Sequence, residues 1–185
     1  MGVACAPCVP DALDGRAAAA RGYEEGMMKT GKAIIAGLVG GIAMTVLGWL
    51  VRLVGLDMNA EMMLGTMVSS PGATAWAIGF VMHLMLSALI ALAYAWGFER
   101  IHRAGAGAGL GFAVIHIAIA GLVMAMIPAM HPMIPEQMPA PGAFMANMGA
   151  TFVALFVLEH LLYGAIVGAT YGPVLHGRPL HSVAA

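Results

Sequence analysis

Four long apolar runs, separated by short polar or proline-rich segments, occupy most of the 185 residues of this chain. We place them at about residues 33–56, 74–98, 106–128 and 148–172, and the fourth can be extended back to about Ala143. A helix needs about 20 mainly apolar residues to cross the hydrocarbon core of a bilayer, and each run reaches that length. The sequence therefore predicts an all-α polytopic membrane protein, a bundle of four transmembrane helices.

The composition agrees with a lipid environment and excludes other classes. Hydrophobic residues make up 61% of the chain and charged residues only 9%, which is too little charge for the surface of a soluble domain. The net charge of −1 gives no basic face for nucleic acid. Because the sequence contains no nucleophile constellation, phosphate loop or nucleotide fingerprint, it gives no support for an enzyme.

The basic residues gather on one side of the predicted bundle. They precede the first run, lie between the second and third, and follow the fourth: Arg16, Arg21, Lys29, Lys32, Arg100, Arg103 and Arg178. Short loops rich in Lys and Arg stay in the cytoplasm, so we expect both termini to be cytoplasmic. Arg52, near the outer end of the first run, is the exception. It can extend to the interface or pair with an acidic loop residue: Asp57, Glu61 or Glu136.

Residues 31–173 form the predicted membrane domain. Residues 1–30 lack apolar periodicity and are expected to be a disordered tail, which a start at a downstream methionine would leave out. Residues 174–185 form a short C-terminal tail. Cys5 and Cys8 make an isolated CxxC in the first tail, and a lone pair of this kind is too unspecific to assign a metal or redox role.

The second and fourth runs share a pattern that indicates internal duplication. From His83 the chain reads HLMLSALIALAY, and from His160 it reads HLLYGAIVGATY. The matched positions end in Tyr94 and Tyr171 and follow one stripe of each helix. The first and third runs match more weakly, so we predict two duplicated helical hairpins of the same orientation. Chance similarity between apolar helices is the alternative.

Glycines four residues apart mark predicted helix contacts, because small side chains let helix backbones approach closely in lipid. They are Gly37 and Gly41, Gly107 and Gly111, and the series Gly164, Gly168 and Gly172. The last series shares the stripe of His160, which favours it as a packing surface.

Three histidines lie near the middle of the apolar runs: His83, His116 and His160. Ionisable groups at lipid depth are costly and usually face a bundle interior, so these three and Glu159 are candidates for one interior site. Three imidazoles and a carboxylate suit zinc, iron or copper, and two opposed histidines suit haem. The same groups also suit a proton or ion relay, or plain hydrogen bonds between helices. The spacing does not choose among these roles.

The predicted outer loops are rich in methionine. Nine of the 17 methionines lie there or in the first turn of the fourth run: Met58, Met62, Met63, Met67, Met130, Met133, Met138, Met145 and Met148. Met130, His131 and Met133 combine thioether and imidazole groups, which suits Cu(I). The alternative is that flexible methionines fill irregular gaps in an interfacial loop. Closely spaced prolines make the same loop a stiff cover over the outer end of the bundle.

The order of these features resembles that of a known family. WAIGFVMH opens the second run, a histidine lies in the third, a loop rich in Met and Pro follows, and FMANMG leads to EHLLYGAIVGATYG. From about Lys32 to Pro173 the chain resembles a family of small bacterial membrane proteins of unknown function, similar to the YagU-like inner-membrane proteins. The resemblance implies a four-helix protein of a bacterial inner membrane. It implies no activity, cofactor or mechanism.

Three functions are compatible with the sequence. The first is binding of a transition metal or haem by the histidines, with copper handling as its specific form. The second is a structural or accessory role in a larger membrane complex. The third is a small proton- or ion-coupled transporter using the histidines and Glu159, which would need a homo-oligomer because four helices are few for a pathway. The lipid bilayer is a partner in all three, and nucleic acid in none.

Overall fold

The computed structural model describes residues 28–174, so most of both predicted tails, with Cys5 and Cys8, lies outside the described residues. Four long helices dominate the described chain, which contains no strand: α2 (Thr30–Leu53), α4 (Ala73–Ile101), α5 (Ala106–Met130) and α6 (Ala150–Tyr171). Each is long and apolar enough to cross a membrane. At this level the predicted fold is confirmed.

The largest difference from the predicted boundaries lies before the fourth long helix. The segment that we extended back to about Ala143 forms a separate 3-10 turn, η1 (Ala143–Met148), and α6 begins at Ala150. Phe144 and Met145 have φ values of 52° and 66°. Residues in this left-handed region cannot continue a right-handed helix. The earlier start was therefore wrong for a local backbone reason.

A short helix, α3 (Ala60–Gly65), lies where the sequence predicts only a loop. Asn59 caps its start, since its side-chain oxygen accepts a hydrogen bond from the backbone N–H of Met62 at 3.0 Å. The helix packs directly on α4. A Cβ added to Gly79 would lie only 1.7 Å from the carbonyl oxygen of Glu61, so the two backbones touch at this point. This segment is thus part of the packed domain.

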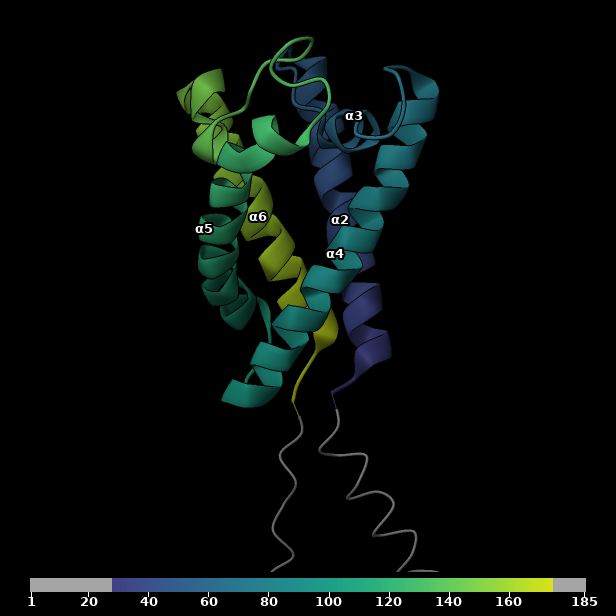
Figure 1. Cartoon of the computed structure of the whole chain (residues 1–185). Coiled ribbons are helices and arrows are strands. Elements are labelled where there is room, and N and C mark those ends of the chain that lie inside the picture. Colours follow the sequence, from purple (N-terminus) through teal and green to yellow (C-terminus); the bar gives the residue numbers. More distant parts are fainter. Residues whose placement is uncertain (1–27, 175–185) are drawn as a thin grey trace, which may run out of the picture. The chain divides into compact units, whose positions relative to one another are not determined.

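The long helices pack in a row that does not close into a ring. The α5 helix packs on α6, α6 on α2, and α2 on α4, whereas α4 and α5 touch at few positions (Figure 1). The start of α2 and the end of α6 lie together, because Nζ of Lys29 donates a hydrogen bond to the carbonyl oxygen of Pro173 at 2.9 Å. We call this the terminal end of the bundle, and the end that carries α3 and η1 the loop end.

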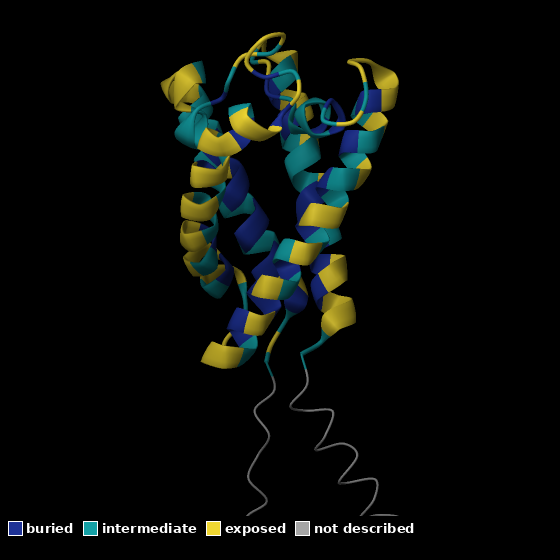
Figure 2. Cartoon of the chain, in the orientation of Figure 1, coloured by how far each residue is buried: buried dark blue, intermediate teal, exposed yellow. Residues whose placement is uncertain are grey.

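Burial follows this arrangement (Figure 2). Buried positions concentrate on the faces of α2, α4 and α6 that meet one another. The α5 helix instead carries a broad exposed apolar surface, which includes Val114, Ile115, Ile119 and Leu122. A soluble protein rarely exposes so large a contiguous apolar area, whereas a membrane protein needs one against lipid.

Candidate functional site

A cavity of about 560 Å³ lies between the α2–α4 pair and the α5–α6 pair, where α4 and α5 fail to pack. This volume falls in the range of small-molecule sites. Its wall is almost entirely apolar. Leu86 of α4 and Ile115 and Ile119 of α5 line it, yet their side chains are roughly half exposed. The cavity therefore opens to the outside between α4 and α5.

The three histidines and Glu159 all line this cavity, although they come from three helices. His116 of α5 and His160 of α6 touch, with ring centroids 4.8 Å apart and planes at 72°. His83 of α4 belongs to the same wall but bonds to other groups, described below. The three histidines thus line one interior cavity, as their similar depth along the helices led us to expect.

The hydrogen bonds of the touching pair define which ring nitrogens face the cavity. Nδ1 of His160 lies 2.7 Å from the carbonyl oxygen of Phe156. A carbonyl can only accept, so Nδ1 carries a proton, and Nε2 presents a lone pair when the ring is neutral. Nδ1 of His116 lies 3.2 Å from the hydroxyl of Tyr94, so this hydrogen bond engages Nδ1 and leaves Nε2 without a partner. Among residues 28–174, every side-chain nitrogen or oxygen that is fully shielded has a partner, so the unpartnered Nε2 atoms must open onto the cavity.

Glu159 is the unusual group of the wall. Its side chain belongs to a residue that is only 6% exposed, and it lines the cavity beside His160. It makes no hydrogen bond or ion pair with any residue between 28 and 174. Arg52 and Glu61 act on it electrostatically, without contact. A buried carboxyl without a partner is costly, and it is therefore the strongest sign of a ligand site in this bundle.

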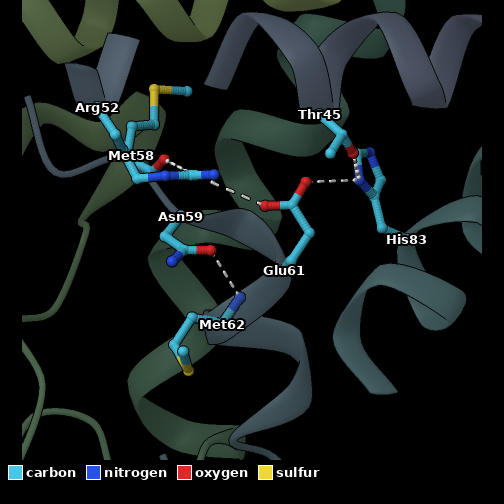
Figure 3. Close-up of polar contacts among 7 residues, drawn as sticks. All are labelled: Thr45, Arg52, Met58, Asn59, Glu61, Met62 and His83. Carbon is cyan, nitrogen blue, oxygen red and sulfur yellow. Dashed lines mark hydrogen bonds and ion pairs between the residues drawn. The ribbon is translucent and has the colours of Figure 1, made fainter. Parts of the chain in front are cut away.

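A second polar group is centred on Glu61 of α3, which does not itself line the cavity (Figure 3). One carboxylate oxygen lies 3.8 Å from Nη1 of Arg52, and the other lies 3.5 Å from Nδ1 of His83. The hydroxyl of Thr45 lies 3.3 Å from the same Nδ1. Nη1 of Arg52 also donates to the carbonyl oxygen of Met58 at 2.7 Å. Of the three acidic residues considered as partners of Arg52, Glu61 is the one that pairs with it. Through Arg52 and His83, Glu61 joins α3 to α2 and α4.

These contacts set the acidity of Glu61. Burial raises the pKa of its carboxyl, but hydrogen bonds from His83 and Thr45 to the charged form outweigh burial and hold the pKa below its ordinary value of 4.5. The folded protein therefore binds this proton more weakly than the unfolded chain does. The resulting stabilisation of the folded protein is complete above about pH 4.5, the pKa of the unfolded chain, and is lost as the pH falls through the lower pKa of the folded protein.

We therefore expect the melting temperature in detergent to decrease as the pH is lowered from about 5.5 to about 3. Glu61→Gln carries no titrating group at this position, so its melting temperature should decrease less over the same range. Thermal unfolding followed by circular dichroism at several pH values measures both. Parallel decreases in the two proteins would show that Glu61 contributes nothing to the acid sensitivity.

Aromatic rings close the cavity towards the terminal end. Tyr94 contacts Phe112, His116 and Tyr163 with ring centroids 5.8–5.9 Å apart. The hydroxyl of Tyr163 donates to the backbone carbonyl of Ser87, which joins α6 to α4. The repeat pattern did not select Tyr163, because this residue lies off the matched stripes.

Tyr171, the predicted equivalent of Tyr94, lies outside the cavity. Its hydroxyl donates to the carboxylate of Glu99 and accepts a hydrogen bond from the backbone N–H of Lys29 at 3.1 Å. It thus fastens the terminal end of the bundle, where the ends of α2, α4 and α6 meet. The two tyrosines share a place in the sequence pattern but differ in what they do.

The proposed copper set of Met130, His131 and Met133 does not line the cavity. Nε2 of His131 donates to the carbonyl oxygen of Met63 at 2.9 Å, and Nδ1 accepts from the backbone N–H of Met133 at 3.1 Å. Both ring nitrogens are occupied, so His131 ties the proline-rich loop to α3 and leaves no lone pair for a metal. Other methionines face the cavity instead: Met44, Met58, Met63, Met124 and Met145.

Among residues 28–174, no group of three or more His, Cys, Asp or Glu side chains is arranged to hold a metal ion. The contact between Nδ1 of His83 and Glu61 helps to explain this, because it engages one of the two ring nitrogens of His83. Sequence analysis could not anticipate that bond, since it depends on α3.

Comparison of the chain with protein-family models, with curated proteins and with solved structures finds no match. The resemblance to the YagU-like proteins thus rests on sequence motifs alone.

Proposed function

We propose that this chain is a membrane protein that binds lipophilic molecules in the cavity of its bundle. The observation that carries the proposal is the cavity itself, an apolar space with the imidazoles of His116 and His160 in its wall. Ligand sites typically combine such a wall with a few polar groups that orient the ligand. The methionines of the wall can adapt to ligands of different shape.

The route into the cavity follows from its opening. The gap between α4 and α5 is flanked by apolar side chains, so a lipophilic ligand can enter from the hydrocarbon phase without crossing a polar barrier. We propose a bacterial inner membrane with both termini cytoplasmic. In support, four of the five Lys and Arg residues between 28 and 174 lie at the terminal end: Lys29, Lys32, Arg100 and Arg103. Only Arg52 lies towards the loop end.

An organic ligand fits the described residues better than haem or a metal ion. Imidazoles on opposite sides of one haem iron would have ring centres about 6 Å apart, given metal–nitrogen bonds of about 2 Å. The rings of His116 and His160 are 4.8 Å apart and in edge contact. An absorption spectrum and metal analysis of detergent-purified protein separate the two ligand classes, because a Soret band or stoichiometric metal would favour the histidines as ligands.

We also propose that the hairpins α2–α4 and α5–α6 descend from one ancestral hairpin. In support, each is a closely packed pair, and the matched residues His83 and His160 line the same cavity. A strict two-fold relation would make the α4–α5 contact equivalent to the α2–α6 contact. The two copies depart from that relation at α4–α5, and the departure leaves room for the ligand.

Filling the cavity is the direct test of lipophile binding. Ala120 lines the cavity from α5, so Ala120→Trp should place an indole inside it. We expect this variant to bind the neutral fluorescent probe N-phenyl-1-naphthylamine at least about tenfold more weakly than the unmodified protein, because the ligand volume is occupied. Fluorescence titration in detergent micelles, corrected for probe in empty micelles, gives the dissociation constants.

Ala118→Trp is the matched control, since Ala118 lies two residues away on the same helix, is exposed and does not line the cavity. It adds the same indole to the outer surface and should leave binding unchanged. Equal probe binding by the two variants and the unmodified chain would refute a cavity site.

A further inference from the structure

We propose that Glu159 makes the cavity selective for lipophilic organic cations, and that a bound cation replaces the proton on this carboxyl. The proposal rests on the lipophile-binding function and names its ligand class. Cation selectivity is distinct from lipophile binding, because a neutral lipophile would occupy the same apolar space without using the carboxyl.

The first ground is the lack of a counter-ion for Glu159. Its carboxylate faces the cavity from a residue that is 6% exposed, and no side chain between residues 28 and 174 donates to it or pairs with it. A Cβ added to Gly48 of α2 would lie 3.7 Å from both Oε1 of Glu159 and Nη1 of Arg52, so both side chains lie near this glycine without contacting each other. An isolated carboxylate is strongly disfavoured in such surroundings, so the empty site holds its proton.

The second ground is that every charged or titratable group around Glu159 is already engaged. Arg52 of α2 donates to Met58 and pairs with Glu61 of α3, so this ion pair carries no net charge. His83 of α4 contacts the same Glu61. The imidazoles of His116 in α5 and His160 in α6 contact each other in an apolar wall, where burial disfavours a charged ring. One positive charge from outside would therefore balance the Glu159 carboxylate.

The third ground is the wall around the carboxyl. Tyr94, Phe112, Phe156 and Tyr163 line the cavity, and aromatic faces attract organic cations. A hard metal cation requires several oxygen ligands, which this apolar wall does not offer. A diffuse ammonium or phosphonium charge on a lipophilic body satisfies both the carboxylate and the rings.

The exchange is balanced in atoms and charge. The neutral carboxylic acid releases one proton to water, and the resulting carboxylate forms an ion pair with the incoming cation without any covalent change. Because proton and cation compete for one group, each weakens the binding of the other by the same factor. Cation affinity should therefore rise by up to about tenfold per pH unit while the empty site is protonated.

Tetraphenylphosphonium is a suitable probe for this exchange, since it is lipophilic and permanently charged. Isothermal titration of the full chain in detergent, at about pH 6 and about pH 8 and in buffers of different protonation enthalpy, gives affinity and proton release together. We expect tighter binding at the higher pH and release of about one proton per bound cation at the lower pH. In Glu159→Gln we expect binding at least about tenfold weaker, with no dependence on pH.

Two controls keep the result interpretable. Glu136→Gln removes an exposed loop carboxyl that does not line the cavity, and it should bind the cation like the unmodified chain. N-phenyl-1-naphthylamine should bind Glu159→Gln normally, which shows that the variant retains a folded cavity.

The outcomes separate the two proposals. Normal binding of the neutral probe together with cation binding that is absent, releases no proton or survives Glu159→Gln would overturn the cation site and leave the lipophile site standing. Failure of both probes to bind the unmodified chain would overturn both proposals.

Discussion

Replacing Gly109 by alanine is expected to lower the free energy of unfolding by more than about 2 kcal/mol, because it forces α5 away from α6. A Cβ at this position would lie 1.9 Å from the carbonyl oxygen of Gly164. The obstructing atom belongs to a helix backbone and cannot rotate aside as a side chain can. The clash also lies next to the backbone hydrogen bond from Gly105 to Gly168, at 3.1 Å, which a separation of the helices would stretch.

Gly111→Ala is the matched control for this prediction. It lies two residues further along α5, and an added Cβ there would meet nothing within 4 Å. Alanine is the better helix former, so this variant should be neutral or gain up to about 1 kcal/mol. Thermal unfolding of both variants in the same detergent gives the comparison. Equal losses would mean that glycine matters here for helix flexibility and not for close approach.

The same glycines show how far spacing alone predicts packing. Gly37 and Gly168 do lie at contacts, since a Cβ on Gly37 would meet the carbonyl oxygen of Ser87 at 2.6 Å and one on Gly168 would meet that of Gly105 at 2.2 Å. Gly172, the last of its predicted series, does not, because an added Cβ there would meet nothing within 4 Å. The predicted contact at Gly107 and Gly111 was wrong, because a Cβ added to either would meet nothing within 4 Å. Alternate residues between 105 and 111 are glycine, so several helix faces offer small residues. Only the position of α6 selects the face of Gly109.

The helices themselves were predictable for a different reason. Each long apolar run depends on about 20 residues together, so one polar residue within it does not change the prediction of a membrane helix. The elements that were missed are short: α3 depends on one capping bond from Asn59, and η1 on the backbone conformations of Phe144 and Met145. Such features are decided by a few atoms and leave little trace in a hydropathy pattern.

The candidate site was predictable in part by similar reasoning. Histidines at similar depth on neighbouring helices tend to meet, and His83, His116 and His160 do line one cavity. Their hydrogen-bond partners depend on geometry that spacing does not contain. Glu61 reaches His83 only because α3 folds back on α4, and Tyr94 reaches His116 only because α5 follows α4 through a short connection.

Glu61→Ala is expected to cost about 3 kcal/mol, since it leaves partly buried Arg52 without its carboxylate. Glu61 is 2% exposed, and the side chain of Arg52 is 20% exposed, so solvent screens the abandoned charge only in part. The same change removes the acceptor of His83 and the link from α3 to the long helices. Thermal unfolding in detergent measures the loss, and proteolysis near α3 should increase.

A double replacement decides whether charge pairing is the cause. If the loss comes from an uncompensated charge, removing Arg52 as well should relieve it, because an apolar pair of similar size avoids the burial of either ion. We therefore expect Arg52→Met with Glu61→Met to be within about 1 kcal/mol of the unmodified chain, and each single methionine variant to be less stable than the double one. Losses that simply add would instead show that each side chain stabilises the bundle independently, through its contacts with Met58 and His83.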